Sequence, residues 1–207
     1  MRSGLRLCLL ILPLMAVSPP PAGAQGNRPG QAGPAAGANP ATPLPASDLP
    51  DRTQASFGDW VVRCETQRPQ GAPAVRVCEM ALTMNDQRGQ PLAQVVLGKP
   101  ARGEPQRMLA QLPLELRVDQ PARLLLDPAA PIAEGLTLPF RLCSVARGGC
   151  FAELEAVPAP VIARIRARAD DQGRLDFRDS SGRDIQILFS FRGFGPALDA
   201  LAREPGG

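Results

Sequence analysis

The sequence predicts a mainly β fold: an antiparallel β-sandwich or barrel-like domain, disulfide-bonded, with one or two short helices near its C-terminus. The first observation behind this prediction is a series of short apolar runs that turn-forming residues separate at close intervals. Such spacing is typical of sandwiches and barrels. The second is the even number of cysteines in the same part of the chain, which is typical of disulfide-bonded exported domains.

The clearest predicted strand spans residues 184–192, where isoleucine or phenylalanine occupies every second position from Ile185 to Phe191. This period of two is that of a strand with one buried face. Residues 174–178 alternate in the same way, and the Asp179–Gly182 segment between the two predicts a hairpin turn. Residues 57–64 predict a turn that leads into a strand. The other predicted strands span residues 75–83, 92–97, 106–116 with Pro113 interrupting it, 122–126, 138–142 and 150–154, the last two pairing as a hairpin.

Two short helices are predicted in the C-terminal third of the chain. Pro160 suits the first turn of a helix, because its missing N–H has no partner there. The apolar face of this helix is expected to consist of Val161, Ile162, Ile165 and Ala169. Gly195 and Pro196 open the second helix, whose core-facing residues are expected to be Ala197, Leu198 and Leu201.

Residues 1–24 have the features of a secretory signal peptide. Arg2 and Arg6 form a positive start, Leu7–Val17 an apolar run, and Ala22–Ala24 a small-x-small cleavage site, so we expect cleavage after Ala24. The apolar run is shorter than the roughly 20 residues of a transmembrane helix. Once the signal is removed, no later segment is predicted to span a membrane.

Residues 25–55 are rich in proline, glycine and alanine and have few bulky apolar side chains. Such a segment cannot bury enough surface to offset the entropy of ordering, so we predict a disordered linker. The apolar runs begin after it, and a single β-rich domain is predicted over residues 56–204. This organisation places the protein in the periplasm, with secretion or outer-membrane association as alternatives.

The composition excludes several functions. The chain has 23 basic and 20 acidic residues, and loss of Arg2 and Arg6 leaves 21 and 20, so its charge gives no reason to expect a nucleic-acid partner. It contains no histidine, which excludes Ser-His-Asp and Cys-His catalysis and histidine-containing zinc sites. No cofactor, metal or catalytic residue is predicted.

The predicted domain contains Cys64, Cys78, Cys143 and Cys150. Four cysteines allow three connectivities, and proximity favours the 64–78 and 143–150 pairs. Cys64 shares the parity of Trp60, and Cys78 that of Met80, so we expect both cysteines of the first pair to face the core. Neither pair has Cys-x-x-Cys or zinc spacing, which favours structural disulfides over a redox or metal site.

Other chemically active side chains are interpreted as structural. The arginines of residues 164–168 are followed by two aspartates, which favours a solvated helix face over a phosphate or lipid-headgroup site. Glu153 and Glu155 lack an apolar pocket that would separate their pKa values for acid–base work. Ser190 and Lys99 have no spacing that supports a serine–lysine dyad.

The motifs together resemble the invasion-associated locus B family of bacterial periplasmic proteins over residues 56–202. They comprise Phe57-Gly58-Asp59-Trp60, the four cysteines, Gly148-Gly149-Cys150-Phe151-Ala152 and the ending Ser190-Phe191-Arg192-Gly193-Phe194 with Ala197, Leu198 and Leu201. The resemblance implies a signal peptide, a mainly β domain and an envelope location, but no catalytic residue. The long linker departs from a compact family member and indicates a domain held away from a surface.

We therefore expect a non-catalytic periplasmic protein that binds or interacts with an unknown envelope or host protein. Gly193–Phe194 and the loops around the 143–150 pair are the expected contact surfaces, although packing is favoured for Phe194 itself. The alternative function is a thiol–disulfide oxidoreductase using Cys143 and Cys150, because the short glycine-flanked loop between them could be reducible. A structural envelope protein without a discrete ligand is a third interpretation.

Overall fold

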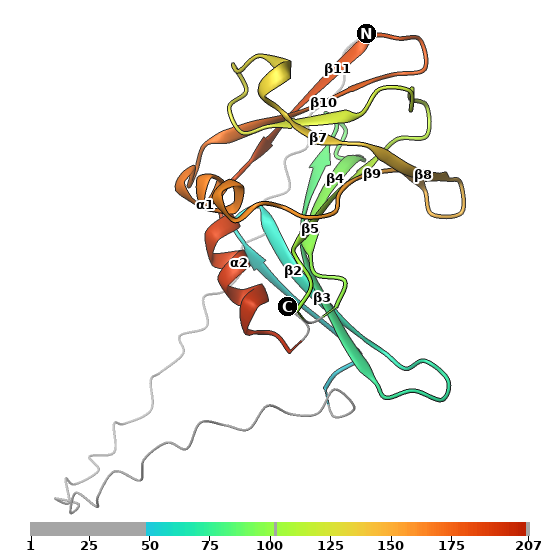
Figure 1. Ribbon diagram of the computed structural model, residues 1–207, viewed down its shortest axis with the longest axis vertical. Coiled ribbons are helices and arrows are strands. Elements are labelled where there is room, and N and C mark those ends of the chain that lie inside the picture. The colour runs from blue at the N-terminus through green and yellow to red at the C-terminus, as the bar shows by residue number, and fades with distance from the viewer. Residues whose placement is uncertain (1–48, 102, 206–207) are drawn as a thin grey trace, which may run out of the picture. The chain divides into compact units, whose positions relative to one another are not determined.

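The computed structural model describes residues 49–101 and 103–205 (Figure 1). The predicted signal peptide and all but the last seven residues of the predicted linker lie outside this part of the chain. The described chain folds into two antiparallel sheets and two α-helices, which confirms the mainly β, disulfide-bonded fold.

The larger sheet has seven strands in the order β1-β2-β3-β4-β5-β9-β8, so β1 to β5 form a meander and β8 is an edge strand. Its strands are β1 (Arg52–Phe57), β2 (Trp60–Gln67), β3 (Val75–Asn85), β4 (Pro91–Gly98), β5 (Arg107–Leu112), β8 (Phe140–Ser144) and β9 (Gly149–Leu154).

The smaller sheet has four strands in the order β11-β10-β6-β7. They are β6 (Ala122–Leu125), β7 (Leu136–Leu138), β10 (Gln172–Arg178) and β11 (Asp184–Ser190). A 3₁₀ turn, η2 (Ile132–Glu134), lies between β6 and β7. The inner faces of both sheets and one face of α2 share a single apolar core, as the alternation of buried side chains along the strands predicts.

The predicted strand 138–142 is wrong as a single element. The chain changes sheets at Pro139: Leu138 ends β7 and pairs with Ala122 in the smaller sheet, whereas Phe140 begins β8 and pairs with Ala152 in the larger one. Proline lacks the N–H that a continuous ladder needs, so the strand breaks where it occurs.

The predicted start of the domain at residue 56 is also too late, because β1 begins at Arg52. Residues 52–56 are exposed and show no apolar alternation, so their sequence resembles the linker. This edge strand pairs with β2 through main-chain hydrogen bonds. Its Arg52 also forms an exposed ion pair with Glu65 of β2 (3.0 Å).

The helices are α1 (Ala159–Ala167) and α2 (Phe194–Arg203). In α1 only Ile165 is buried, and Ala169, which was expected on its apolar face, lies beyond its end in a left-handed conformation. In α2 the expected residues Ala197, Leu198 and Leu201 are buried together with Phe194, which begins the helix one residue earlier than predicted.

Two motifs about 130 residues apart form a clasp that joins β2 to the start of α2. The Trp60 indole N–H donates to the Ser190 carbonyl (3.1 Å), and its ring meets that of Phe194 edge-on at 5.1 Å. The Asp59 amide donates to the Arg192 carbonyl (3.0 Å), and the two side chains form an ion pair (2.5 Å). We call these contacts the Trp60 clasp.

The hydrogen bond from Arg192, with a second one from Ser190, lowers the pKa of Asp59 below its usual value. A carboxyl group whose pKa is lower in the folded state stabilises the fold above its unfolded pKa of about 3.9, and loses this effect as the pH falls through the folded pKa. We expect the midpoint temperature of thermal unfolding to fall less between pH 5 and pH 2 in Asp59→Asn than in the unaltered protein. Equal pH dependence of the two would contradict this assignment.

Candidate functional site

The short disulfide joins the two strands of the β8–β9 hairpin. Cys143 and Cys150 face each other directly in the ladder, with their Cα atoms 3.9 Å apart. The chain turns between them, where the Gly148 amide donates to the Val145 carbonyl (3.0 Å) and Gly148 has a positive φ. The pairing is the one that sequence proximity favours.

The hairpin is apolar and exposed at its end. Val145 is 82% exposed and Leu142 is 42% exposed. Cys143 is exposed as well, whereas Cys150 is buried. Figure 1 shows the turn extending away from α1 and α2. Because β8 is an edge strand, its outer main-chain groups have no strand beside them in the described part of the chain.

Contacts with β5 hold the base of the turn in place. The Gln111 side-chain amide donates to the carbonyls of Arg147 and Gly148 (3.4 Å each). Gly149 packs so closely that a Cβ atom there would lie 2.6 Å from the Leu112 carbonyl oxygen. The disulfide and these contacts together leave the hairpin with little freedom to fold back on the sheet.

The charge on the hairpin is positive at its end. Arg141 forms an ion pair with Glu155 (2.6 Å) near the base. Arg147, at the turn, has no carboxylate within ion-pair distance among residues 49–101 and 103–205. The exposed surface thus combines two apolar side chains with one cation, and it carries no acid–base pair.

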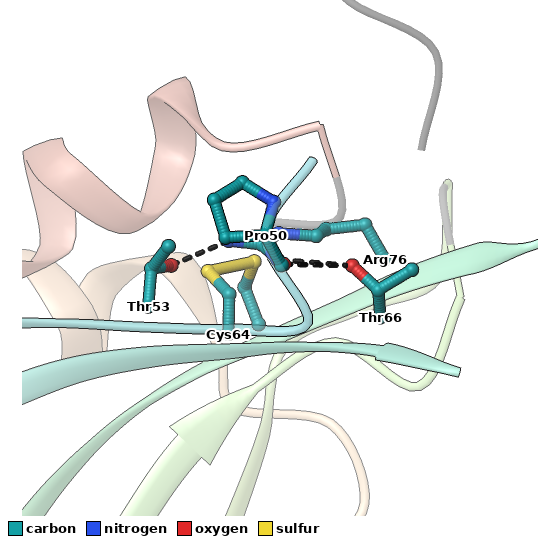
Figure 2. Close-up of a disulfide and its surroundings, with 6 residues drawn as sticks. Pro50, Thr53, Cys64, Thr66 and Arg76 are labelled. Atoms are coloured by element: carbon teal, nitrogen blue, oxygen red, sulfur yellow. Dashed lines mark hydrogen bonds between the residues drawn. A yellow bond between two sulfur atoms is a disulfide. The ribbon is translucent and has the colours of Figure 1, made fainter. Parts of the chain in front are cut away.

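The second disulfide joins β2 to β3, near the edge of the larger sheet that is opposite β8. Figure 2 shows this disulfide with Pro50, Thr53, Thr66 and Arg76 around it. Cys64 and Cys78 face each other in the ladder between β2 and β3, and both are buried as expected. Beside them, the buried Arg76 guanidinium donates to the Pro50 carbonyl (2.7 Å) and to the Thr66 hydroxyl (3.0 Å). It also donates to the Thr53 hydroxyl.

The hydrogen bonds around this disulfide fix the point at which the chain enters the domain. Besides Arg76, the Thr66 hydroxyl donates to the Pro50 carbonyl (3.2 Å) and the Thr66 amide to the Asp51 carbonyl (2.8 Å). The burial of Arg76 was not predicted from the sequence. Its signal was present, because Arg76 shares the parity of Cys78 in its strand.

One cluster of potential metal ligands occurs among the described residues. A Glu204 carboxylate oxygen and the sulfurs of Cys64 and Cys78 lie within 4.8 Å of one another. The two sulfurs are joined in the disulfide, and thiolates are the form in which cysteine binds metal. The oxidised cluster therefore does not offer a metal site.

Several of the other sequence candidates take part in structural contacts. Arg166 pairs with Asp199 of α2 (2.8 Å), and Glu153 with Arg107 (3.4 Å). The Ser190 hydroxyl accepts from the Arg192 amide (3.0 Å). Phe194 is 1% exposed, so its expected packing is confirmed and the Gly193–Phe194 contact surface is wrong.

Comparisons with known proteins identify the family. The family model described as invasion associated locus B (IalB) protein matches residues 60–202, which is most of the chain. The chain belongs to this family. Its matched region includes both disulfides and the contacts of Trp60 with Ser190 and Phe194.

A solved structure shows the same fold. The crystal structure of invasion associated protein B from Bartonella henselae matches with a TM-score of 0.56 and 18% sequence identity, covering 72% of this chain and 96% of that one. A comparison with curated proteins gives no match. None of the helices in the described part of the chain is long and apolar enough to cross a membrane.

Proposed function

We propose that this chain is an exported, non-catalytic interaction protein of the cell envelope that binds another protein through the β8–β9 hairpin. Membership of the IalB family supports an envelope role. The predicted signal peptide and the two disulfides fit an oxidising compartment outside the cytoplasm. Invasion, to which the name of the Bartonella protein refers, is not part of the proposed role.

The exposed hairpin end is the observation that carries this proposal. Large apolar side chains on an edge strand favour aggregation unless a partner covers them. A partner strand that pairs with β8 would satisfy its outer main-chain groups and cover Leu142 and Val145, as in other complexes formed by strand addition. Arg147, which forms no ion pair with any described residue, favours a partner with an acidic residue near its apolar segment.

Site-specific photo-crosslinking in cells of the source bacterium tests the proposal. A photoreactive amino acid at Val145 is expected to give a discrete protein adduct, whereas the same probe at Gln87 is expected to give none. Gln87 is the matched control because it is also exposed at a hairpin turn, the one between β3 and β4.

A second probe shows whether the adduct depends on the surface itself. With the photoreactive residue at Leu142, Val145→Asp is expected to reduce the adduct at least tenfold, since a buried carboxylate without a partner would oppose binding. Two results would contradict a partner on the hairpin. One is an equal yield of adduct from the probes at Val145 and Gln87, and the other is a yield at Leu142 that Val145→Asp does not change.

A thiol–disulfide oxidoreductase is the second candidate, and the exposure of Cys143 is the observation in its favour. In that reaction a substrate thiolate would attack the Cys143 sulfur and release the Cys150 thiolate. A second substrate thiolate would then displace Cys143, leaving a substrate disulfide and two reduced cysteines, which a periplasmic thiol oxidase would reoxidise.

A further inference from the structure

The outer face of the smaller sheet carries a groove of about 640 Å³ that is separate from the hairpin. Its floor includes Asp176 and Arg174 of β10, Arg123 of β6 and Gln186 of β11, and one wall is formed by Pro131 and Ile132 of the β6–β7 connection. This volume is within the usual range for small-molecule sites, which is roughly 300–1,000 Å³. We call it the Asp176 groove.

Asp176 is a buried carboxylate that lacks part of its hydrogen bonding. Its side chain is 5% exposed, and its Oδ1 accepts from Arg174 Nε (2.8 Å). Its Oδ2 is buried and has no hydrogen-bond partner in the described part of the chain. Leaving a charged acceptor unsatisfied in this way is costly, so Asp176 is prepared to accept a donor that the fold does not supply.

Strand alternation places this carboxylate on the groove side of the sheet. Leu175 and Phe177 are buried in the core, so Asp176 between them projects to the opposite face. Arg174, on the same face, is already engaged: it donates to the carbonyls of Pro128 and Ala130 as well as to Asp176. It therefore has few donors left for Oδ2.

An arginine that forms no ion pair with the described carboxylates lies next to Asp176. Arg123 is directly opposite Asp176 in the ladder between β6 and β10. Its guanidinium donates instead to the Thr137 hydroxyl (2.5 Å) and the Gly135 carbonyl (3.4 Å), on the side of β7. No ion pair of Arg123 occurs within the described residues. The groove thus offers an acceptor and a cation side by side.

We propose that the Asp176 groove binds a small zwitterion with N–H donors, an α-amino acid or a short peptide. Its ammonium group donates to Asp176 Oδ2, its carboxylate accepts from Arg123, and an apolar side chain packs against Ile132 and Pro131. Arg123 gives up its contact with β7 for a charge-assisted, forked hydrogen bond, which is stronger than a bond to a neutral oxygen. This site is independent of the hairpin proposed above.

A titration of the mature protein with L-leucine and with L-alanyl-L-leucine, followed by two-dimensional amide NMR, tests the proposal. At least one of these probes is expected to shift the signals of residues on β6, β10 and β11 around the groove. Glycine betaine, a zwitterion without N–H donors, is expected to shift none of them. Failure of both probes to shift the groove signals, or equal shifts by glycine betaine, would overturn the proposal.

Two variants and a control complete the test. Asp176→Asn and Arg123→Gln are each expected to weaken binding at least tenfold, because each removes one charge that the zwitterion meets. Arg183→Gln, at an exposed residue outside the groove, is expected to bind as the unaltered protein does. If Asp176→Asn does not fold, Arg123→Gln provides the test on its own. An Arg123→Gln variant that binds the probe as tightly as the unaltered protein would overturn the proposal.

Discussion

Replacing Gly193 by alanine is expected to lower the free energy of unfolding by at least about 3 kcal/mol, or to prevent folding altogether. Gly193 precedes α2 with a φ of 89°, which side chains rarely adopt. A Cβ atom there would lie 1.8 Å from the Phe57 carbonyl oxygen. The Trp60 clasp would have to open to make room, so the core side of α2 would lose its position against β2.

Gly195→Ala is the matched control, two residues further on. Gly195 is already in the helix, and apart from its chain neighbours and the backbone of that helix no described residue lies within 4 Å of a Cβ atom there. Alanine is the better helix former by about 1 kcal/mol, so this variant is expected to be as stable as the unaltered protein or more stable. Urea unfolding followed by tryptophan fluorescence compares the two, and a Gly193→Ala variant as stable as Gly195→Ala would contradict the clasp.

Removing the buried disulfide is the second change with a large expected effect. Cys64→Ala/Cys78→Ala is expected to lower the free energy of unfolding by about 3–5 kcal/mol. The loop-entropy contribution of a 15-residue loop is about 3 kcal/mol. The rest of the loss arises because the two sulfurs fill the core beside the buried Arg76, and truncating buried side chains leaves a cavity.

Cys143→Ala/Cys150→Ala provides the comparison. Its loop is shorter, with a sequence separation of 7 against 14, and Cys143 is exposed. We expect a loss of about 2.5 kcal/mol, measured by the same urea unfolding. If the hairpin pair proved the more destabilising of the two, the assignment of Cys64–Cys78 to the core and of Cys143–Cys150 to a surface clamp would be wrong.

Much of the fold could be predicted because many of its elements depend on residues that are close together in the sequence. The alternation around Phe189 identifies β11 and its buried face, and the spacing of Cys143 and Cys150 identifies the hairpin between them. The parity of Trp60 and Cys64 correctly places both in the core. In each case the residues that matter are close in sequence, and the strand period alone decides which way they point.

The features that sequence analysis missed depend on contacts between distant segments. Pro139 indicates a break in the strand, but the sequence beside it does not indicate that Leu138 and Phe140 pair in different sheets. The exposed strand β1 is recognised only from its pairing with β2. The Asp176 groove forms because Arg123 of β6 pairs with Asp176 of β10, which follows it by about 50 residues in the sequence. The sequence around either residue does not indicate this pairing.

The central claim is that the β8–β9 hairpin binds a partner and that its disulfide takes no part in thiol–disulfide exchange. The reduction potential of Cys143–Cys150 tests this claim most directly. The ladder keeps the two cysteines opposite each other, which favours the disulfide, so we predict a potential below about −300 mV, the range of structural disulfides. The measurement equilibrates the protein in thiol buffers, traps free thiols and maps them by mass spectrometry, with a reduced dithiol protein added to detect turnover. A potential near the −120 mV of strong periplasmic oxidants, together with repeated turnover, would contradict the account and establish the oxidoreductase.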